Sequence, residues 1–450
     1  MITRVWYRVH NPRDHAGVWD AAGDGGYCWG VNALPSNRTY GEQLDVADPL
    51  AKFRDRFLRA DDAPIYLDGN SLGPLPLATQ ARIAEVVGSE WGTGLVRSWG
   101  HWVGLPREVG DLIGEHLTGA GPGQILVGDS TTVNLFKLVN AALDAQPGRN
   151  VLVTDDDNFP TDRYVLQGVA AQRRCELRML HTDLDQGVAE DALLDALGPD
   201  VALVSLSHVA YRSGALADMP RITGQVHEAG ALMAWDLCHS VGAVPIKLDA
   251  SAADLAVGCT YKYLNAGPGA PAFLYVRREL QEQMRQPIWG WFGQSDQFAM
   301  GPAYDPVPGI DRFGTGTPDI IGTVAVAEGT KLLAEARIER LREKGIALTS
   351  YLIHLADEWL EPLGFRLASP RADARRGNHV TLHHPDAWRI SQALIAAGVI
   401  GDYRTPDRLR LGPAPIITRF TDVWDAIDRL RKIAADKSYE DLPAELARVT

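Results

Sequence analysis

Lys262 is the residue of this sequence whose surroundings best suit covalent chemistry. It lies between two tyrosines, after the apolar run 255–257 and before the turn 265–269, which is rich in glycine and proline. We therefore expect its amine to be fixed in a walled site. A lysine whose pKa is lowered by burial can form a Schiff base with an aldehyde. A lysine at a strand end more often extends into solvent, so this interpretation requires partners elsewhere in the chain.

Possible partners follow other predicted strands. A strand at 124–127 leads through a polar turn into a helix, and the free N–H groups at a helix start favour a phosphate. The strand 151–154 ends in an acidic turn with Phe159, whose ring could cover an aromatic cofactor. Each signal alone would indicate only a cap. The polar residues that come just after predicted strands are Thr131, Asp162, Ser207, Asp236 and Lys262.

The elements that must position these residues alternate between strands and helices. Such alternation predicts an α/β fold with a mainly parallel sheet, whose strand carboxyl ends converge on one crevice. We expect a large domain at 49–325 and a smaller α+β domain at 326–450. A helical region from about 323 to 360, broken at Gly345, marks the boundary. Residues 1–48 lack a convincing period, and we expect an irregular extension there.

Pyridoxal 5'-phosphate has the aldehyde, phosphate, aromatic ring and basic nitrogen that these parts would fit. Lys262 would hold the aldehyde and Asp236 the ring nitrogen. A carboxylate beside that nitrogen favours the protonated ring, which then acts as an electron sink. Asp236 alone could equally be a strand-end cap. Arg410 lies in a predicted strand and would grip a substrate carboxylate bidentately if it faces the crevice.

Composition excludes several classes of protein. The chain has 450 residues, 46% of them hydrophobic, and a formal net charge of −13 without a basic tract, which argues against nucleic acid or an anionic membrane as a partner. No apolar run reaches the roughly 18 residues of a membrane span. The four cysteines are scattered without metal-binding spacing, which suits a reducing cytoplasm and implies no metal site.

Four segments, taken together, resemble kynureninase: 66–73, 158–162, 235–243 and 261–271. The resemblance extends from about residue 65 to residue 430. It implies the aspartate-aminotransferase-type fold, known as fold type I, and a homodimer with active sites at the subunit interface. It also implies hydrolysis of L-kynurenine, or of 3-hydroxykynurenine, to the corresponding anthranilate and L-alanine.

The resemblance also implies roles for individual residues. Lys262 would carry the cofactor and later remove the substrate α-proton, and Tyr261 would donate and relay protons. The other residues around the cofactor would be Thr131, Thr132, Phe159, Pro160, Thr161, Asp162, Ser207, Asp236 and His239, with Trp291 and Thr317 from the neighbouring subunit. Arg410 would hold the substrate α-carboxylate, and Ser71 and His101 match other substrate-side positions.

The sequence departs from the family pattern at Ala210, Gln294, Asp319 and the pair 416–417. We expect these departures to alter the aryl pocket and leave the cofactor site intact. A paralogue that cleaves a substituted kynurenine or another β-acyl alanine is therefore one alternative.

Two further alternatives use other chemistry or none. Desulfuration or transamination on the same fold is one, but desulfuration needs a mobile nucleophilic cysteine, and Cys238 and Cys259 lie in predicted structured segments. A catalytically silent binding protein is the other. The intact set of Lys262, Asp236 and Arg410 argues against it.

Overall fold

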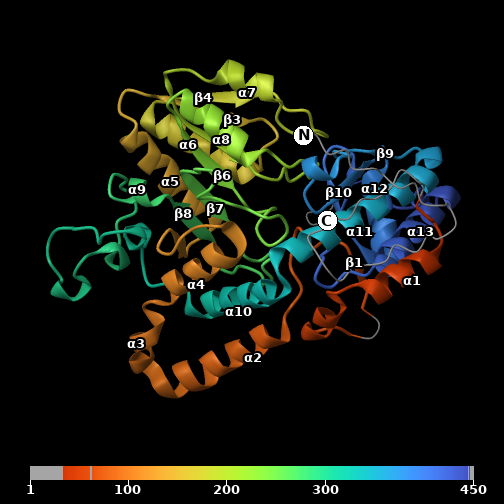
Figure 1. Ribbon diagram of the computed structural model, residues 1–450, viewed down its shortest axis with the longest axis horizontal. Helices are drawn as coiled ribbons and strands as arrows, with labels where there is room; N and C mark the ends of the chain where they lie inside the picture. Colours follow the sequence, from red (N-terminus) through yellow and green to blue (C-terminus); the bar gives the residue numbers. More distant parts are fainter. Residues whose placement is uncertain (1–33, 61–62, 444, 446–450) are drawn as a thin grey trace, which may run out of the picture. The chain divides into compact units, whose positions relative to one another are not determined.

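A computed structural model describes residues 34–60, 63–443 and 445. Residues Ser36–Thr450 form one compact unit, which contains every described helix and strand. At its centre is a seven-stranded sheet in the order β2-β8-β7-β6-β5-β3-β4 (Figure 1). The strands are β2 (Ile125–Val127), β3 (Val151–Asp155), β4 (Glu176–Leu180), β5 (Val201–Ser207), β6 (Leu232–Asp236), β7 (Leu255–Gly258) and β8 (Phe273–Val276). Only β8 runs against the others in this sheet, so the predicted, mainly parallel sheet is confirmed.

Side chains of successive strand residues enter two different cores, as the period of two in a strand requires. In β3, Val151 and Val153 join the core beneath α4 (Leu105–Ile113), α8 (Met219–Glu228) and α10 (Ile320–Ala336). Leu152 joins the opposite core, which is covered by α5 (Thr131–Ala145) and α6 (Pro160–Arg173). Burial on both faces explains why these strands read as nearly continuous apolar runs.

A second, antiparallel sheet lies in the C-terminal part of the chain, in the order β12-β13-β10-β9. Its strands are β9 (Arg366–Leu367), β10 (Val380–His383), β12 (Asp402–Arg404) and β13 (Arg408–Leu411). A separate hydrophobic core joins this sheet to α11 (Ile338–Trp359), α12 (Ala387–Ala396) and α13 (Phe420–Asp436). This arrangement fits the predicted small α+β domain, and the boundary at 325/326 remains a prediction.

The remaining elements are short. β1 (Ile65–Tyr66) pairs in parallel with β11 (Val399–Ile400). The other helices are α1 (Arg38–Ala47), α2 (Leu77–Glu85), α3 (Trp99–Trp102), α7 (Glu190–Ala196) and α9 (Arg278–Gln281). Helical turns with 3-10 or π geometry span Ala51–Arg56, Val86–Gly94, Leu95–Ser98, Gly114–Thr118, Trp291–Gly293, Gln297–Ala299, Ile310–Phe313, Glu361–Leu363 and Asp373–Arg375. No helix among the described residues is long and apolar enough to cross a membrane.

The predicted break at Gly345 is wrong, because Gly345 lies inside α11. The long helical region breaks instead at Arg337, whose φ of 69° separates α10 from α11. A Cβ at residue 345 would lie 2.1 Å from the side-chain oxygen of Asn378. The lack of a side chain at Gly345 therefore lets α11 pack closely against the segment before β10. The local sequence does not reveal this contact.

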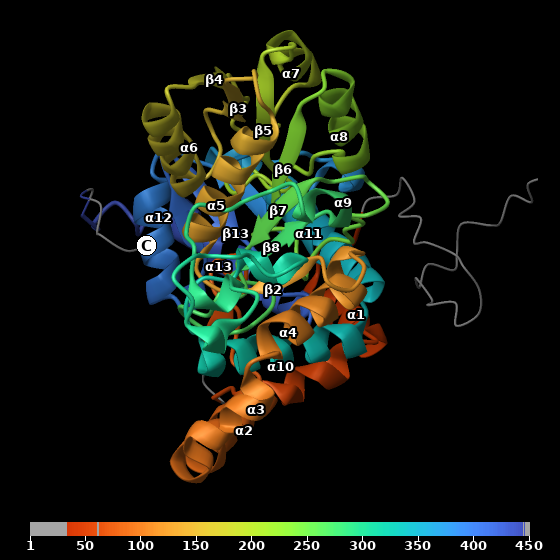
Figure 2. The same cartoon turned by 90° about the vertical axis from the view of Figure 1, so that its left-hand side faces the viewer.

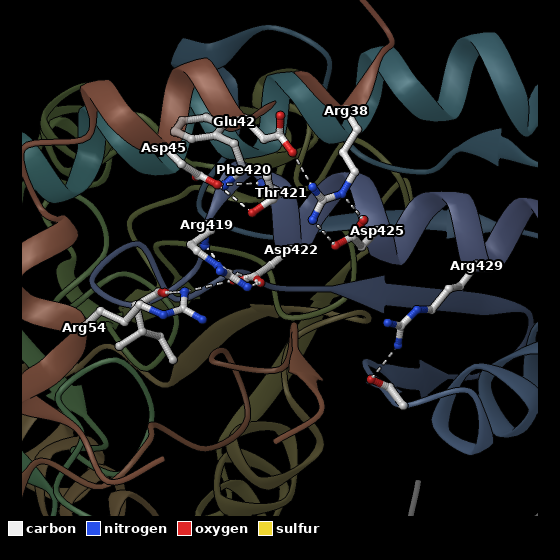
Figure 3. Close-up of polar contacts among 12 residues, drawn as sticks. Arg38, Glu42, Asp45, Arg54, Arg419, Phe420, Thr421, Asp422, Asp425 and Arg429 are labelled. Atoms are coloured by element: carbon white, nitrogen blue, oxygen red, sulfur yellow. Dashed lines mark hydrogen bonds and ion pairs between the residues drawn. The ribbon is translucent and has the colours of Figure 1, made fainter. Parts of the chain in front are cut away.

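The predicted irregular extension is also wrong where residues 38–47 form helix α1. Figure 3 shows this helix attached to the start of α13: Arg38 Nε lies 2.8 Å from Asp425 Oδ1, and the Asp45 carboxylate accepts hydrogen bonds from the Phe420 and Thr421 amides at 2.6 and 3.1 Å. A short helix gains most of its stability from such tertiary contacts. Residues 1–33 of the predicted extension lie outside the described residues.

Candidate active site

The Lys262 amine lies in a walled site, as the sequence predicts. The residue follows β7, is buried, and places Nζ 3.2 Å from His239 Nε2. The same amine lies 5.7 Å from the ring centroid of Phe159 and 5.9 Å from that of Tyr261. Gly73 closes one wall, because its amide donates to the Tyr261 carbonyl and a Cβ there would lie 2.1 Å from the Lys262 carbonyl oxygen.

Two carboxyl groups lie next to each other at the carboxyl end of the sheet. Asp236 ends β6, and its oxygens accept hydrogen bonds from the Cys238 amide at 2.7 Å and from Ser207 Oγ at 3.3 Å. Asp162 lies in the first turn of α6 and is fully buried. Burial, and then the charge of Asp236, raises the pKa of Asp162 well above its ordinary value. Burial beside Asp236 therefore favours the neutral form of Asp162.

The start of α5 supplies the groups that could hold a phosphate. Ser130 caps this helix by accepting from the Val133 amide, so the helix begins with Thr131 and Thr132. Thr131 Oγ1 lies 3.9 Å from Cys238 Sγ, at the end of the neighbouring strand β6. A cavity of about 830 Å³ opens beside this helix start and is also lined by Tyr261 and Thr317. Free backbone N–H groups at a helix start suit a phosphate dianion.

Together these groups fit pyridoxal phosphate. Lys262 offers an amine, Asp236 a hydrogen-bonded carboxylate, α5 an anion site, and Phe159 a ring at the same cleft. Pro160 and Thr161 form the first turn of α6, which positions Asp162. The structure brings these sequence-predicted residues together because strand order places β3, β5, β6 and β7 side by side.

Arg410 is completely buried and is already paired within the chain. Its Nε and Nη2 grip the carboxylate of Asp402 at 2.8 and 2.5 Å, Nη1 donates to the Tyr211 carbonyl at 2.6 Å, and Nη2 donates to Ser71 Oγ at 2.9 Å. Burial disfavours the charge of Asp402, but the Arg410 guanidinium holds the pKa of Asp402 below its ordinary value. The predicted bidentate partner of Arg410 is therefore an internal carboxylate in this structure.

Sequence reasoning missed Asp402, and also His379. Asp402 lies opposite Arg410 in the antiparallel pairing of β12 with β13. Alternation along a predicted hairpin could have suggested that pair. His379 is fully buried, and its ring centroid lies 5.7 Å from that of His239. Neither of its ring nitrogens has a hydrogen-bond partner among the described residues. No local signal points to it.

The structure does not bring His101 to Lys262 within one chain. His101 lies in α3 and its Nε2 is 2.9 Å from the Glu90 carboxylate, which also accepts from the Trp102 indole at 2.6 Å. Figure 2 shows α2 and α3 extending away from the seven-stranded sheet. Any contact of His101 with substrate would have to be made in a neighbouring subunit.

Trp291 and Thr317 belong to the segment between β8 and α10. The Trp291 ring is 43% exposed and packs edge-on against Phe292 at 4.9 Å. Thr317 lines the 830 Å³ cavity together with Thr131 and Tyr261. Within one chain, therefore, Thr317 reaches the phosphate side of the site while Trp291 lies at the surface.

The residues that depart from the family pattern do not form one pocket. Gln294 and Asp319 line the 830 Å³ cavity, where Asp319 also caps α10 by accepting from the Gly322 amide at 2.9 Å. Ala210 lines a separate cavity of about 320 Å³. Ile416 and Ile417 are buried in the core. Within one chain the departures therefore lie on different elements, and their effect on the aryl pocket stays a prediction.

Known proteins are similar to this chain over most of its length. A family model described as the kynureninase C-terminal domain matches residues 341–430. The chain is similar to a kynureninase of Burkholderia pseudomallei, with 46% identity over 87% of this chain and 94% of the relative, and to one of Pseudomonas fluorescens, with 43% identity over 88% and 95%.

Solved structures show the same fold at low identity. A cysteine desulfurase from Escherichia coli superimposes with a TM-score of 0.73 and 18% identity over 88% of this chain and 99% of that chain. A cysteine desulfurase from Thermococcus onnurineus gives 0.72 and 17% over 88% and 98%. The predicted fold type I is thereby confirmed. Identity above 40% over almost the whole length of curated relatives is decisive for the family: the chain belongs to the kynureninase family.

Proposed function

We propose that this protein is a pyridoxal-phosphate-dependent hydrolase that cleaves the Cβ–Cγ bond of L-kynurenine or 3-hydroxykynurenine. The products would be the corresponding anthranilate and L-alanine. The observation that carries this proposal is the placement of buried Lys262 against His239, with the Asp162–Asp236 pair and the α5 helix start at the same strand ends. Similarity to curated kynureninases supports the choice of substrate.

Each part of the cofactor has residues suited to it. Lys262 would attach the aldehyde carbon, Asp236 would face the ring nitrogen, and Thr131 and Thr132 would hold the phosphate. When bound, pyridoxal phosphate supplies an electron sink that stabilises negative charge at the substrate α-carbon. Because Asp162 is neutral, it adds no second charge next to Asp236. One carboxylate is thus left to favour a protonated ring nitrogen.

Proton transfer would fall to the residues around the Lys262 amine. The amine, once free, takes the α-proton of the substrate. Burial, and then the charge of Lys262, lowers the pKa of His239 well below its ordinary value, so His239 meets the amine as a neutral imidazole at 3.2 Å. Burial raises the pKa of Tyr261, so this phenol keeps its proton and could donate it to Cβ, the carbon that stays with alanine when the Cβ–Cγ bond breaks.

We also propose a homodimer with shared active sites, located in the cytoplasm. Five large apolar side chains of the segment between β8 and α10 are exposed: Ile288 (37%), Trp289 (60%), Trp291 (43%), Phe298 (78%) and Met300 (75%). Such a patch on a protein surface favours a protein–protein interface. A partner seated there would bring Trp291, and the arm that carries His101, toward a neighbouring site.

The direct test is product analysis. The purified protein with pyridoxal phosphate is incubated with L-kynurenine, and anthranilate and L-alanine are quantified by chromatography. We expect the two products in equal amounts. Release of sulfide from L-cysteine under the same conditions would instead indicate desulfuration. Absence of cleavage of kynurenine, 3-hydroxykynurenine and other aroyl-alanines would reject the proposal.

Replacing Arg410 with methionine is expected to raise KM for kynurenine by about 10- to 100-fold, since a charge-assisted hydrogen bond contributes about 1.5–3 kcal/mol. Steady-state kinetics measure the effect, and a thermal melt checks that the variant is folded. Arg408→Met is the matched control, because Arg408 is a buried arginine of the same strand that pairs with Asp185. An unchanged KM in the Arg410 variant would mean that the carboxylate is bound elsewhere.

Among the departures, Gln294 is expected to affect ring preference, because it lines the cavity that Tyr261 and Thr317 also line, whereas Ala210 does not. Gln294→His should change the ratio of kcat/KM for 3-hydroxykynurenine and kynurenine by about 10-fold, the effect of one polar group left unpaired. Ala210→Asn serves as the control and should leave the ratio unchanged. The reverse outcome would place the aryl ring at the smaller cavity.

A further inference from the structure

We propose that Arg404 is a second arginine of the substrate-carboxylate site, and that it and Arg410 receive the α-carboxylate together while Asp402 holds both guanidinium groups in place. The proposal rests on the proposed function, since it assumes an amino-acid substrate. It adds a binding residue, Arg404, and a positioning residue, Asp402, to the predicted site.

Arg410 has few donors left for a substrate. A guanidinium has five N–H groups. Four of those of Arg410 are used within the chain: by Asp402 twice, by Ser71 Oγ and by the Tyr211 carbonyl. With its amide oxygen turned toward Arg410, Asn70 would also accept from Nε and Nη2, at 2.8 and 3.0 Å. One N–H on Nη1 remains, whereas a bidentate carboxylate requires two parallel donors.

Arg404 lies where the second donor is needed. In the pairing of β12 with β13, Asp402 lies opposite Arg410 and Arg404 lies opposite Arg408. Residues two apart in a strand point to the same face, so Asp402, Arg404 and Arg410 share one face of this hairpin. The contact is direct, because Arg404 Nη2 lies 2.7 Å from the same Asp402 oxygen that binds Arg410.

Arg404 also keeps donors that Arg410 has lost. Besides Asp402, its one hydrogen-bond partner among the described residues is the Tyr403 carbonyl at 3.2 Å. Its Nε is buried and has no partner in the same described set. Its side chain is 29% exposed, whereas that of Arg410 is 1% exposed. Arg404 can therefore be reached by a ligand, while Arg410 forms the inner wall.

The charge of the group favours an anion. Two guanidinium groups face one firmly ionised carboxylate, Asp402. The other acid of the cluster is Asp68, and burial, followed by the charge of Asp402, raises its pKa to about 7. Three phenols lie near this group, and burial raises the pKa of each, so they keep their protons: Tyr66, Tyr211 and Tyr263. The group therefore has positive charge to offer a substrate carboxylate.

The charge of Arg404 also reaches the site of the chemistry. It is among the charges that lower the pKa of His239, whose Nε2 lies 3.2 Å from Lys262 Nζ. The charge of Arg404 also opposes the rise that burial causes in the pKa of Tyr211, whose ring packs edge-on against Phe159 at 5.3 Å. Contacts connect the same groups, because Arg410 Nη1 donates to the Tyr211 carbonyl and the Phe159 ring centroid lies 5.7 Å from Lys262 Nζ. A carboxylate held between the two arginines would thus lie next to the cleft that contains Lys262.

Equilibrium titration of the holoenzyme tests the proposal. L-Alanine and ethylamine differ by the carboxylate alone, and binding of either is followed through the visible absorbance of the cofactor. The dissociation constant of ethylamine divided by that of L-alanine measures carboxylate recognition. Arg404→Gln should lower this ratio by about 10-fold with ethylamine binding unchanged, because one charge-assisted contact is lost. Arg404→Lys keeps the charge but loses the planar guanidinium group, and it should lower the ratio by a few-fold.

Arg408→Gln is the matched control and should leave the ratio unchanged, since Arg408 is on the same face but pairs with Asp185. Asp402→Asn should lower the ratio at least as much as Arg404→Gln, because both arginines lose their anchor. An unchanged ratio in the Arg404→Gln variant overturns the inference. If that variant does not fold, an unchanged ratio in Arg404→Lys overturns it equally. A wild-type protein that binds L-alanine no better than ethylamine would instead count against the proposed amino-acid substrate.

Discussion

Replacing Lys262 with alanine is expected to lower kcat for kynurenine cleavage by about 10⁴-fold or more, because the variant loses both the covalent attachment of the cofactor and the base for the α-proton. The amine of Lys262 lies 3.2 Å from His239 Nε2 and 5.7 Å from the ring centroid of Phe159. Borohydride reduction of the holoenzyme followed by peptide mapping should place the pyridoxyl label on Lys262 alone.

The control for this prediction is Lys247→Ala. Lys247 is an exposed lysine between β6 and β7, whereas Lys262 follows β7. Its replacement should leave both the label and the rate unchanged. A label on Lys247, or a Lys262→Ala variant that retains more than a few per cent of the activity, would contradict the assignment of Lys262.

Replacing Asp236 with asparagine is expected to slow α-proton exchange of L-alanine by about 10²- to 10³-fold while the cofactor stays bound. The amide keeps the shape of the carboxylate but cannot stabilise a protonated ring nitrogen, and two to three pKa units at 1.36 kcal/mol each correspond to that factor. Loss of the α-proton signal in deuterium oxide, followed by NMR, measures the exchange rate directly.

Asp162→Asn is the matched control, and the protonation state of Asp162 makes this control informative. Because Asp162 is a neutral acid in the folded protein, an amide of the same shape replaces it without removing a charge. We expect the rate of α-proton exchange to change by less than about 10-fold, because the amide N–H can donate a hydrogen bond in place of the carboxylic acid O–H. Equal losses in the two variants would mean that Asp162 and Asp236 share one negative charge. No loss in the Asp236 variant would mean that Asp236 serves only to cap the turn after β6.

The sequence predicted most of the large sheet because the relevant patterns are local. Strands β3, β5, β6 and β7 are apolar runs of four to seven residues, each followed by polar or turn-forming residues. Edge strand β4 was missed because only one of its five side chains is buried and it lacks an apolar run. Helix α1 was missed for a related reason, since its stability comes from Asp425, Phe420 and Thr421, almost four hundred residues away.

The sequence alone also located the residues that could hold the cofactor. Ser207 and Asp236 end strands β5 and β6, and Thr131, Asp162 and Lys262 come shortly after β2, β3 and β7. Parallel strands bring such positions to one edge without any knowledge of side-chain contacts. Position along a strand is a local property, and the direction of the strands follows from the helices between them.

Only the tertiary structure decided what these residues pair with. Buried charges must find partners, and a partner is set by register and strand order across long stretches of chain. Asp402 takes the carboxylate position opposite Arg410 because β12 and β13 pair in antiparallel register, and Ser71 reaches the same group from more than three hundred residues away. His101, by contrast, turns to Glu90 at the surface. Residue types define the chemistry a chain can perform, but burial and register determine which of those residues meet.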